Sequence, residues 1–237
     1  MACERCDNAA RSSYGRRLER RADAERLLSQ PAVVRVMGDR GLDGALQRDL
    51  CRVVSLEWEQ FDMVRGMAGR AGCQDDPRRF LAYRCAQYLA FPHQMIPRVL
   101  AELERAELEG RNLVEEKYAR MMAVTDPDAY RESCAQRIPE ASPVKRAALA
   151  QLRDLLLPAL ADAARDLPES HLHARPDVSS AGRVSSMDYF LAEVEGYSLG
   201  SIFALRDALA HQLGHENPIE SSWELAVGLL GAMGKGA

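Results

Sequence analysis

Apolar side chains recur every three or four residues along most of the chain, and this spacing is typical of α-helices that bury one face. Strict alternation of apolar and polar residues, which would indicate β-strands, is absent. Prolines, glycines and Asp-Pro or Ser-Pro pairs separate the periodic segments. The predicted helices are 42–67, 79–91, 96–124, 142–166 interrupted or kinked at Pro158, 186–213, and a short one from Ser221. The sequence therefore predicts an all-α fold, a single-domain bundle of about six to eight helices.

The two ends of the chain differ from its middle. Residues 1–30 carry the arginine-dense run Arg16-Arg17-Leu18-Glu19-Arg20-Arg21 and few apolar residues, which predicts a mobile or loosely docked N-terminal arm. The helical domain is expected over 31–230, with a loop at 167–186 that contains prolines and a serine cluster. A glycine-rich stretch, 231–237, is expected to be a flexible tail.

Charge and cysteine usage narrow the cellular setting. The formal net charge is −4, with basic residues dispersed among acidic ones, so we expect no nucleic-acid partner. No stretch approaches the roughly 18 to 20 apolar residues that cross a bilayer, and no signal peptide is evident, so we expect no membrane partner and a cytoplasmic location. The six cysteines are then expected to be free thiols.

The helix predicted at 42–67 carries an acidic residue on its apolar face. With Leu50 at zero and about 100° per residue, Val64 falls near −40° and Phe61 near 20°, and Glu57 falls between them at roughly −20°. A carboxylate in such a place either finds a cation, such as Arg65, Arg70 or Arg111, or has its pKa raised toward the range of a general acid or base. Glu59 falls roughly opposite, so it faces solvent or a second interface.

Two further predicted helices carry polar residues near their apolar stripes. In 96–124, Glu107 and Arg111 lie inside the stripe, and with Glu115 they have the i,i+4 spacing of an ion ladder. In 186–213, a polar row borders the stripe. Its members are Glu193, Tyr197, Ser201, His211 and His215. This row lines either a wet cavity between helices or the boundary between core and solvent.

Metal and nucleophile motifs are sparse. His211 and His215 share a helix face but lack the neighbouring Glu of a zinc-protease motif, and we predict no metal site and no required cofactor. His171 with His173, and Cys3 with Cys6, also fall short of a structural zinc site. Cys73 precedes a helix, where its thiol is either reactive or simply buried. No phosphate-binding loop or nucleophile elbow occurs.

Three strings of the chain resemble a bacterial helical family of unknown function, DUF4125. They are Glu57-Trp58-Glu59-Gln60-Phe61, Gly69-Arg70-Ala71-Gly72-Cys73-Gln74-Asp75-Asp76, and Gly110-Arg111-Asn112-Leu113 with Glu116-Lys117-Tyr118-Ala119-Arg120-Met121-Met122. The similarity extends from about Leu50 to His215. The resemblance implies a helical fold, and in some relatives this domain is joined to a nucleotidyltransferase-like domain. It supplies no reaction, but it points to Glu57, Arg70, Gln74, Asp75, Arg111, Tyr118 and Glu193.

These observations lead to three hypotheses. The first is a biosynthetic or tailoring enzyme acting on a small polar or anionic metabolite, with Glu57, Tyr118 and Glu193 as catalytic residues. Its substrate-binding residues would be Arg70, Gln74, Asp75, Arg111 and Tyr197. The second is a non-catalytic binding or regulatory module with a protein partner or a second copy of the chain. The third is a metal or haem oxidase that uses His93, His211 or His215.

Overall fold

The computed structural model of the chain describes residues 4–65, 69–172, 175–176 and 178–234. These residues form twelve α-helices and two short 3-10 helices, and they contain no strand beyond one isolated bridge between Ser180 and Arg183. The helices are α1 (Glu4–Leu28), α2 (Pro31–Asp39), α3 (Gly44–Met63), η1 (Gly72–Asp75), α4 (Pro77–Ala90), η2 (His93–Met95), α5 (Ile96–Leu108), α6 (Leu113–Thr125), α7 (Pro127–Ser133), α8 (Pro143–Asp166), α9 (Pro168–Leu172), α10 (Ser186–Val194), α11 (Leu199–Gln212) and α12 (Pro218–Gly234). The all-α prediction is confirmed, with more helices than expected.

The helix predicted over 96–124 is two helices, because the chain reverses at Gly110. Gly110 has a φ of 71°, a conformation that favours glycine. The N–H of Arg111 donates to the carbonyl of Ala106 at 2.8 Å, which closes the end of α5 in the manner of a glycine C-cap. The side chain of Asn112 then caps α6 by accepting from the N–H of Glu115 at 2.9 Å.

The helix predicted over 186–213 is also two helices. Gly196 lies in the turn between α10 and α11, where an added Cβ would approach the carbonyl oxygen of Glu193 to 3.2 Å. Lys145 of α8 donates to the carbonyls of Glu195 and Tyr197, at 3.0 and 2.8 Å, and so satisfies backbone groups that the break leaves open.

Most helices begin at a proline or directly after a capping side chain. Asp76 accepts from the N–H of Arg79 at 3.0 Å and precedes Pro77, so it caps α4. Ser142 caps α8 in the same way, and α8 continues past Pro158 to Asp166.

Other boundaries differ from the expectation. Helix α3 ends at Met63, and the expected end at Met67 lies outside the described residues. Helix α12 begins earlier, at Pro218, and continues to Gly234. Helices α2, α7 and α9 were not predicted, since each is short and begins at a proline.

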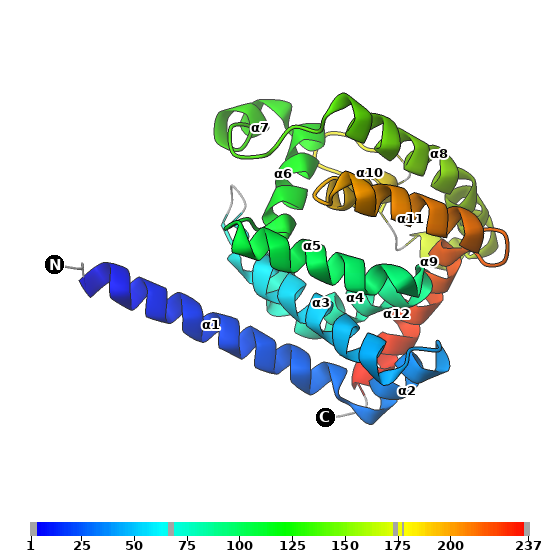
Figure 1. Ribbon diagram of the computed structural model, residues 1–237, viewed down its shortest axis with the longest axis horizontal. Helices are drawn as coiled ribbons and strands as arrows, with labels where there is room; N and C mark the ends of the chain where they lie inside the picture. Colours follow the sequence, from blue (N-terminus) through cyan, green and yellow to red (C-terminus); the bar gives the residue numbers. More distant parts are fainter. Residues whose placement is uncertain (1–3, 66–68, 173–174, 177, 235–237) are drawn as a thin grey trace.

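Helix α3 forms the centre of the buried core. Its residues Val53, Val54 and Trp58 are fully buried, and it packs against α1, α4, α5 and α6. Figure 1 shows α1 running along the outer side of α3, with its N-terminal end extending beyond the other helices. Helix α12, drawn in red, packs along α4, so the two ends of the helical region meet around the same core.

The described part of the N-terminal arm is helical. Toward its C-terminal end, α1 buries Ala24, Leu27 and Leu28 in the core, and Arg20 lies over the ring of Trp58 with its guanidinium carbon 5.2 Å from the ring centroid. None of the described helices combines the length and the apolar character needed to cross a bilayer.

Candidate functional site

Arg84 of α4 lies at the centre of a buried ion cluster. Its Nε and Nη2 donate to the two carboxylate oxygens of Glu57 on α3, at 2.7 and 2.6 Å. Its Nη1 and Nη2 also donate to the two oxygens of Glu193 on α10, both at 2.9 Å. The Arg84 side chain is only 6% exposed. One guanidinium therefore binds two carboxylates, each through two hydrogen bonds, which is the geometry that arginine forms best.

Lys117 of α6 adds a second buried cation. Its Nζ contacts Glu193 Oε2 at 3.3 Å and donates to the hydroxyl oxygen of Tyr189 at 2.9 Å. The four residues Glu57, Arg84, Lys117 and Glu193 are called the Arg84 cluster below, and their formal charges cancel. Although burial opposes ionisation, the charges of Arg84 and Lys117 lower the pKa of Glu193 to about 2, so this group stays a carboxylate near neutral pH.

Neighbouring polar side chains form the remaining hydrogen bonds of the buried ions. The hydroxyl of Tyr88 donates to Glu57 Oε1 at 2.7 Å and accepts from Arg84 at 2.9 Å. Gln87 accepts from Arg84 at 2.7 Å and donates to Glu193 at 3.2 Å. Burial holds the pKa of Tyr88 well above its usual range, so Tyr88 remains a proton donor to the carboxylate. Both oxygens of Glu57 are thus engaged by partners inside the protein.

A cavity of about 870 Å³ adjoins the Arg84 cluster. Its wall includes Arg84 of the cluster and the neighbouring Gln87, together with two further cations, Arg79 and Arg175. Aromatic and apolar side chains form most of the rest of the wall, and they come from α4 and the residue after it, α8, α10 and α12. The main ones are Tyr83, Phe91, Leu156, Leu160, Tyr189, Phe190, Ile219 and Trp223. A cavity of this size, apolar with a few convergent polar groups, is typical of small-molecule sites.

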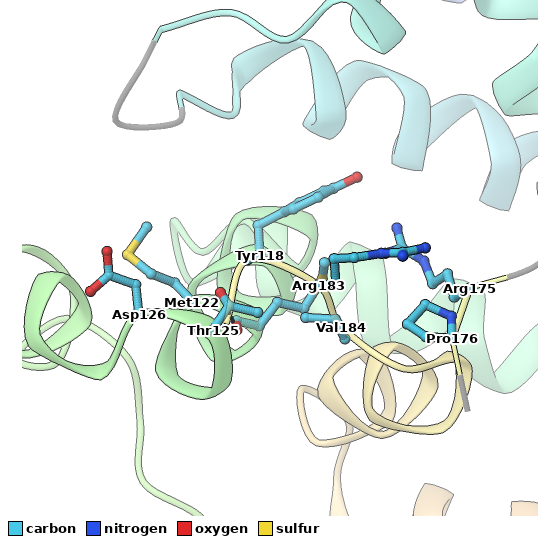
Figure 2. Close-up of a pocket in the computed structure, with 10 residues that line it drawn as sticks. Tyr118, Met122, Thr125, Asp126, Arg175, Pro176, Arg183 and Val184 are labelled. Carbon is cyan, nitrogen blue, oxygen red and sulfur yellow. Dashed lines mark hydrogen bonds between the residues drawn. The ribbon is translucent and has the colours of Figure 1, made fainter. Parts of the chain in front are cut away.

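A smaller cavity of about 460 Å³ lies on the other side of Arg175. Figure 2 shows Tyr118 of α6 and the arginines Arg175 and Arg183, from the loop before α10, among its lining side chains. Arg175 also lines the larger cavity, and its guanidinium carbon lies 4.1 Å from the centroid of the Tyr189 ring. Tyr189 raises the pKa of Tyr118, so the two phenols are close neighbours. These three side chains therefore separate the two cavities.

The structure places the predicted residues Glu57 and Glu193 together and buries both. The cation that pairs with Glu57 is Arg84, and the expectation of Arg65, Arg70 or Arg111 was wrong. Arg65 instead donates to backbone carbonyls at the end of α3. Helical angles show which face a residue occupies but not which helix lies against that face, so the partner could not be derived from them.

Arg70, Gln74 and Asp75 act together at a different place, the loop after α3. Arg70 contacts the carboxylate of Asp62 at 2.7 Å and donates to Asp75 at 2.9 Å. Buried Gln74 donates to the carbonyl of Phe61 at 2.5 Å and accepts from the N–H of Ala71 at 2.8 Å. These contacts tie the loop to the end of α3, and none of these three residues lines either cavity.

Arg111 belongs to a separate ion network on α6 and α10. It donates to both oxygens of Glu116, at 2.7 and 2.8 Å, and Glu116 in turn accepts from Arg120 at 2.9 Å. The expected Glu107–Arg111–Glu115 ladder was wrong, because the break at Gly110 removes the helical spacing. Glu107 instead pairs with Arg17 of α1.

The polar row predicted along 186–213 is divided by the break at Gly196. Tyr197 is buried, and burial together with the charges of Glu193 and Glu57 raises its pKa, so it lies close to the Arg84 cluster. Ser201 donates to Glu102 of α5 at 2.5 Å. Tyr118 lines the smaller cavity and stacks on Phe61, with ring centroids 5.6 Å apart.

The histidine candidates lie apart from the Arg84 cluster. His93 contacts the carbonyl of Leu89 at 3.0 Å, and the rings of His211 and His215 lie 5.4 Å apart at the exposed end of α11. Among the described residues, no three His, Cys, Asp or Glu side chains gather as a metal site would require. His173 and the side chains of Cys3 and Cys6 lie outside the described residues.

Four of the cysteines are described, and all four are free thiols. They are Cys51, Cys73, Cys85 and Cys134. Cys73 is exposed in the short helix η1, whereas Cys85 is fully buried on α4. Burial holds the pKa of the Cys85 thiol well above its usual range, so this thiol stays protonated and unreactive near neutral pH.

Sequence reasoning missed Arg84, Lys117 and Tyr189. The angular method that selected Glu57 would have found the two cations. With Leu81 at zero, Arg84 falls at about −60° beside the apolar stripe of α4. With Leu113 at zero, Lys117 falls at about 40° inside the stripe of α6. Nothing in the local spacing distinguishes Tyr189 from an ordinary aromatic residue of the core.

Comparison with protein families gives a match over residues 49–231 to the family described as Protein of unknown function (DUF4125). The match includes the four residues of the Arg84 cluster and most of the wall of the larger cavity. Comparison with curated proteins and with solved structures gives no significant match.

Proposed function

The chain belongs to the DUF4125 family, and from its geometry we propose that it is a small-molecule enzyme whose larger cavity binds an anionic metabolite with an apolar or aromatic portion. The observation that carries this proposal is the position of Arg84. A guanidinium held by two buried carboxylates cannot rotate away from the cavity wall without leaving Glu57 without its cation and Glu193 with Lys117 alone, so it is a preorganised group.

The charges around the cavity favour an anion. Beside the charge-balanced Arg84 cluster, Arg79 and Arg175 line it, and Glu169 is the only acidic residue among the lining side chains of the described chain. Arg79 forms no ion pair with any described residue, and its guanidinium lies over the ring of Tyr83 at 5.8 Å. Cations that converge on a partly enclosed space attract carboxylate or phosphate groups.

The aromatic and apolar side chains of the cavity wall favour an apolar or aromatic portion of the ligand. Phe91 and Phe190 meet edge to face with ring centroids 5.4 Å apart, and Trp223 of α12 lies in the same wall. Apolar surface of this kind gains free energy when a ligand displaces water from it, at about 25 cal/mol per Å². A small aromatic or branched aliphatic acid would match both the cationic and the apolar side chains of the cavity.

The contacts of Glu57 support a positioning role for it. Its two oxygens bind Arg84 and Tyr88, and Glu57 does not line either cavity. Glu193 also lies behind the wall that Arg84 and Gln87 form. We therefore propose that these carboxylates orient Arg84 and Lys117, while the acid–base function of Glu57 expected from its helical position stays a prediction.

Calorimetric titration tests the binding step. Naphthoate, the neutral naphthamide and the cationic naphthylmethylamine have similar shapes and differ in charge, so the proposal expects the order naphthoate, naphthamide, naphthylmethylamine from strongest to weakest. Replacing one charged partner costs about 1 kcal/mol or more, so Arg175→Gln should weaken naphthoate binding at least about fivefold. The control Arg146→Gln removes an exposed arginine of α8 that lines neither cavity and should leave binding unchanged.

Conversion of a ligand separates the enzyme from the non-catalytic module that is the alternative. The full chain is incubated with a mixture of small aromatic and aliphatic acids, which is then analysed by mass spectrometry. An enzyme should deplete one acid, and Arg175→Gln should deplete it more slowly. Tight binding of naphthoate with every acid recovered intact would support the binding module, and equal affinity for the anion and the cation would contradict the proposed site.

A further inference from the structure

We propose that Tyr189 exchanges a proton with the molecule bound in the larger cavity, and that Lys117 is the positioning residue that holds its phenolate form. This inference rests on the proposed function, because it names the group that would react there. Tyr189 lines the cavity, whereas Lys117 lies behind it on α6. The proposal therefore gives the cavity a proton donor and acceptor that the buried carboxylates do not supply.

Two cationic side chains, Lys117 and Arg175, contact Tyr189. Lys117 donates to its hydroxyl oxygen at 2.9 Å, and the same Nζ lies 4.4 Å from the centroid of its ring. Arg175 covers the ring, with its guanidinium carbon 4.1 Å from the centroid. Cations placed over and beside a phenol stabilise the negative charge that appears on its oxygen when the proton leaves.

Charged and titratable groups from four parts of the chain act on Tyr189. They are Arg84 on α4, Lys117 and Tyr118 on α6, Glu193 on α10 and Arg175 on the preceding loop. Burial alone would raise the pKa of Tyr189, and Glu193 acts in the same direction. The charges of Lys117 and Arg84 outweigh these effects and hold the pKa of Tyr189 below its ordinary value.

The neighbouring Tyr118 behaves differently. Burial raises its pKa, and Tyr189 raises it further, so Tyr118 keeps its proton when Tyr189 loses one. The pair therefore contains one phenol that ionises and one that stays protonated. Tyr118 also lines the smaller cavity.

The proton transfer balances without any further reactant. As an acid, Tyr189 breaks its O–H bond, the proton passes to a basic oxygen, nitrogen or carbon of the ligand, and the electron pair stays on the phenolate oxygen beside Lys117. As a base, the phenolate takes a proton from an acidic group of the ligand and becomes the neutral phenol. An ionisable group whose pKa lies nearer to neutrality transfers protons more effectively in both directions.

Ultraviolet difference titration of the full chain tests the first part of the proposal without any ligand. Phenolates absorb where phenols do not, so the wild type should show one of its seven tyrosines ionising before the others. Tyr189→Phe should remove that early step, whereas the control Tyr130→Phe, on α7 outside both cavities, should leave it in place. Persistence of an early step in Tyr189→Phe, or its absence from the wild type, would overturn the proposal.

The role of Lys117 is tested in the same titration. Lys117→Met keeps the length of the side chain and removes the charge, and it should move the early step up by about one pH unit or more. Since this variant leaves Glu193 with one cation fewer and can fail to fold, Arg175→Gln provides a second measurement at an exposed position. It should move the step upward by less, and an unmoved step in both variants would remove the cationic explanation.

Proton uptake on binding connects the phenol to the cavity. Calorimetry of naphthoate is repeated in buffers of different ionisation heat, at a pH where Tyr189 is ionised. An anion placed beside the phenolate raises its pKa, so the wild type should take up a proton as naphthoate binds. Tyr189→Phe should bind naphthoate without that uptake. Failure of naphthoate to bind the wild type contradicts the proposed function alone, whereas binding with equal proton uptake in both proteins contradicts the role of Tyr189.

Discussion

Glu57 and Glu59 lie two residues apart on α3 and face opposite sides of it, and each holds arginine side chains in a different way. Glu57 faces the core and binds Arg84, whose side chain is 6% exposed. Glu59 is equally buried but faces α1, where it pairs with Arg17 and Arg21, whose side chains are 34% and 39% exposed. The same helix therefore carries a fully buried ion cluster on one face and a half-solvated one on the other.

The contrast shows that the burial of a carboxylate does not by itself determine what its ion pair contributes. At the α1–α3 interface, a lost carboxylate leaves arginines that water can reach, so the remaining charges are rehydrated at low cost. In the Arg84 cluster, the loss of any member leaves charges that water cannot reach easily. We therefore expect the first interface to tune the docking of α1 and the second to determine whether the core forms.

The largest expected effect comes from Arg84→Met. It leaves Glu57 and Glu193 facing each other with one shared cation fewer, and breaking a buried pair of this kind costs about 3–5 kcal/mol. Urea denaturation should show this loss in the free energy of unfolding. The control Arg146→Met, at an exposed position of α8, should change it by no more than about 0.5 kcal/mol. Similar losses in both variants would mean that the Arg84 cluster contributes no more than a surface residue.

The second largest effect is expected in the stability of the protein at low pH. Since the folded pKa of Glu193 is about 2 and the ordinary value is 4.5, the unfolded chain binds more protons between these limits. Stability from Glu193 is therefore present above about pH 4.5 and is lost as the pH falls through the folded value. Unfolding free energies measured from pH 7 downward should fall less steeply in Glu193→Gln than in the wild type. An identical slope in the two proteins would show that Glu193 is not held as a carboxylate.

The smallest effect is expected for Glu59→Gln. Its two arginine partners can turn to solvent, so we expect a loss of about 1–2 kcal/mol in urea denaturation. About 1 M salt screens half-exposed pairs strongly and buried pairs little. The difference between Glu59→Gln and the wild type should therefore shrink at high salt, whereas the effect of Arg84→Met should remain. Equal salt dependence of the two variants would remove the distinction between the two faces of α3.

The sequence predicted faces of helices better than it predicted partners. Helical geometry placed Glu57 on the apolar face and Glu59 roughly opposite, toward solvent or a second interface; both residues are buried, and Glu59 lies at the second interface, with α1. It could not show that Arg84 meets Glu57, because that contact depends on how α4 crosses α3. The hydrogen bond from Lys117 to Tyr189 joins residues 72 positions apart, so it could not be predicted from the spacing of residues within one helix.

The missed helix breaks have a related cause. Gly110 and Gly196 were visible in the sequence, but the apolar period continues across both, so periodicity alone predicted unbroken helices. At Gly110 the deciding factor is a backbone conformation with positive φ. At Gly196 it is the close approach of the chain to Glu193 and Leu113, where an added Cβ would be crowded at 3.2 and 3.4 Å.

The order in which the chain is made has a consequence for the Arg84 cluster. Glu57 and Arg84 are separated by 27 positions, whereas Glu193 follows Arg84 by 109. At about 5–20 residues per second of synthesis, Glu193 emerges on the order of 5–20 s after Arg84. During that interval Arg84 can pair with Glu57 alone, and Lys117 has yet to meet its carboxylate. Glu57 and Arg84 can therefore neutralise each other before Glu193 emerges, whereas Lys117 must stay in contact with water until it pairs with Glu193.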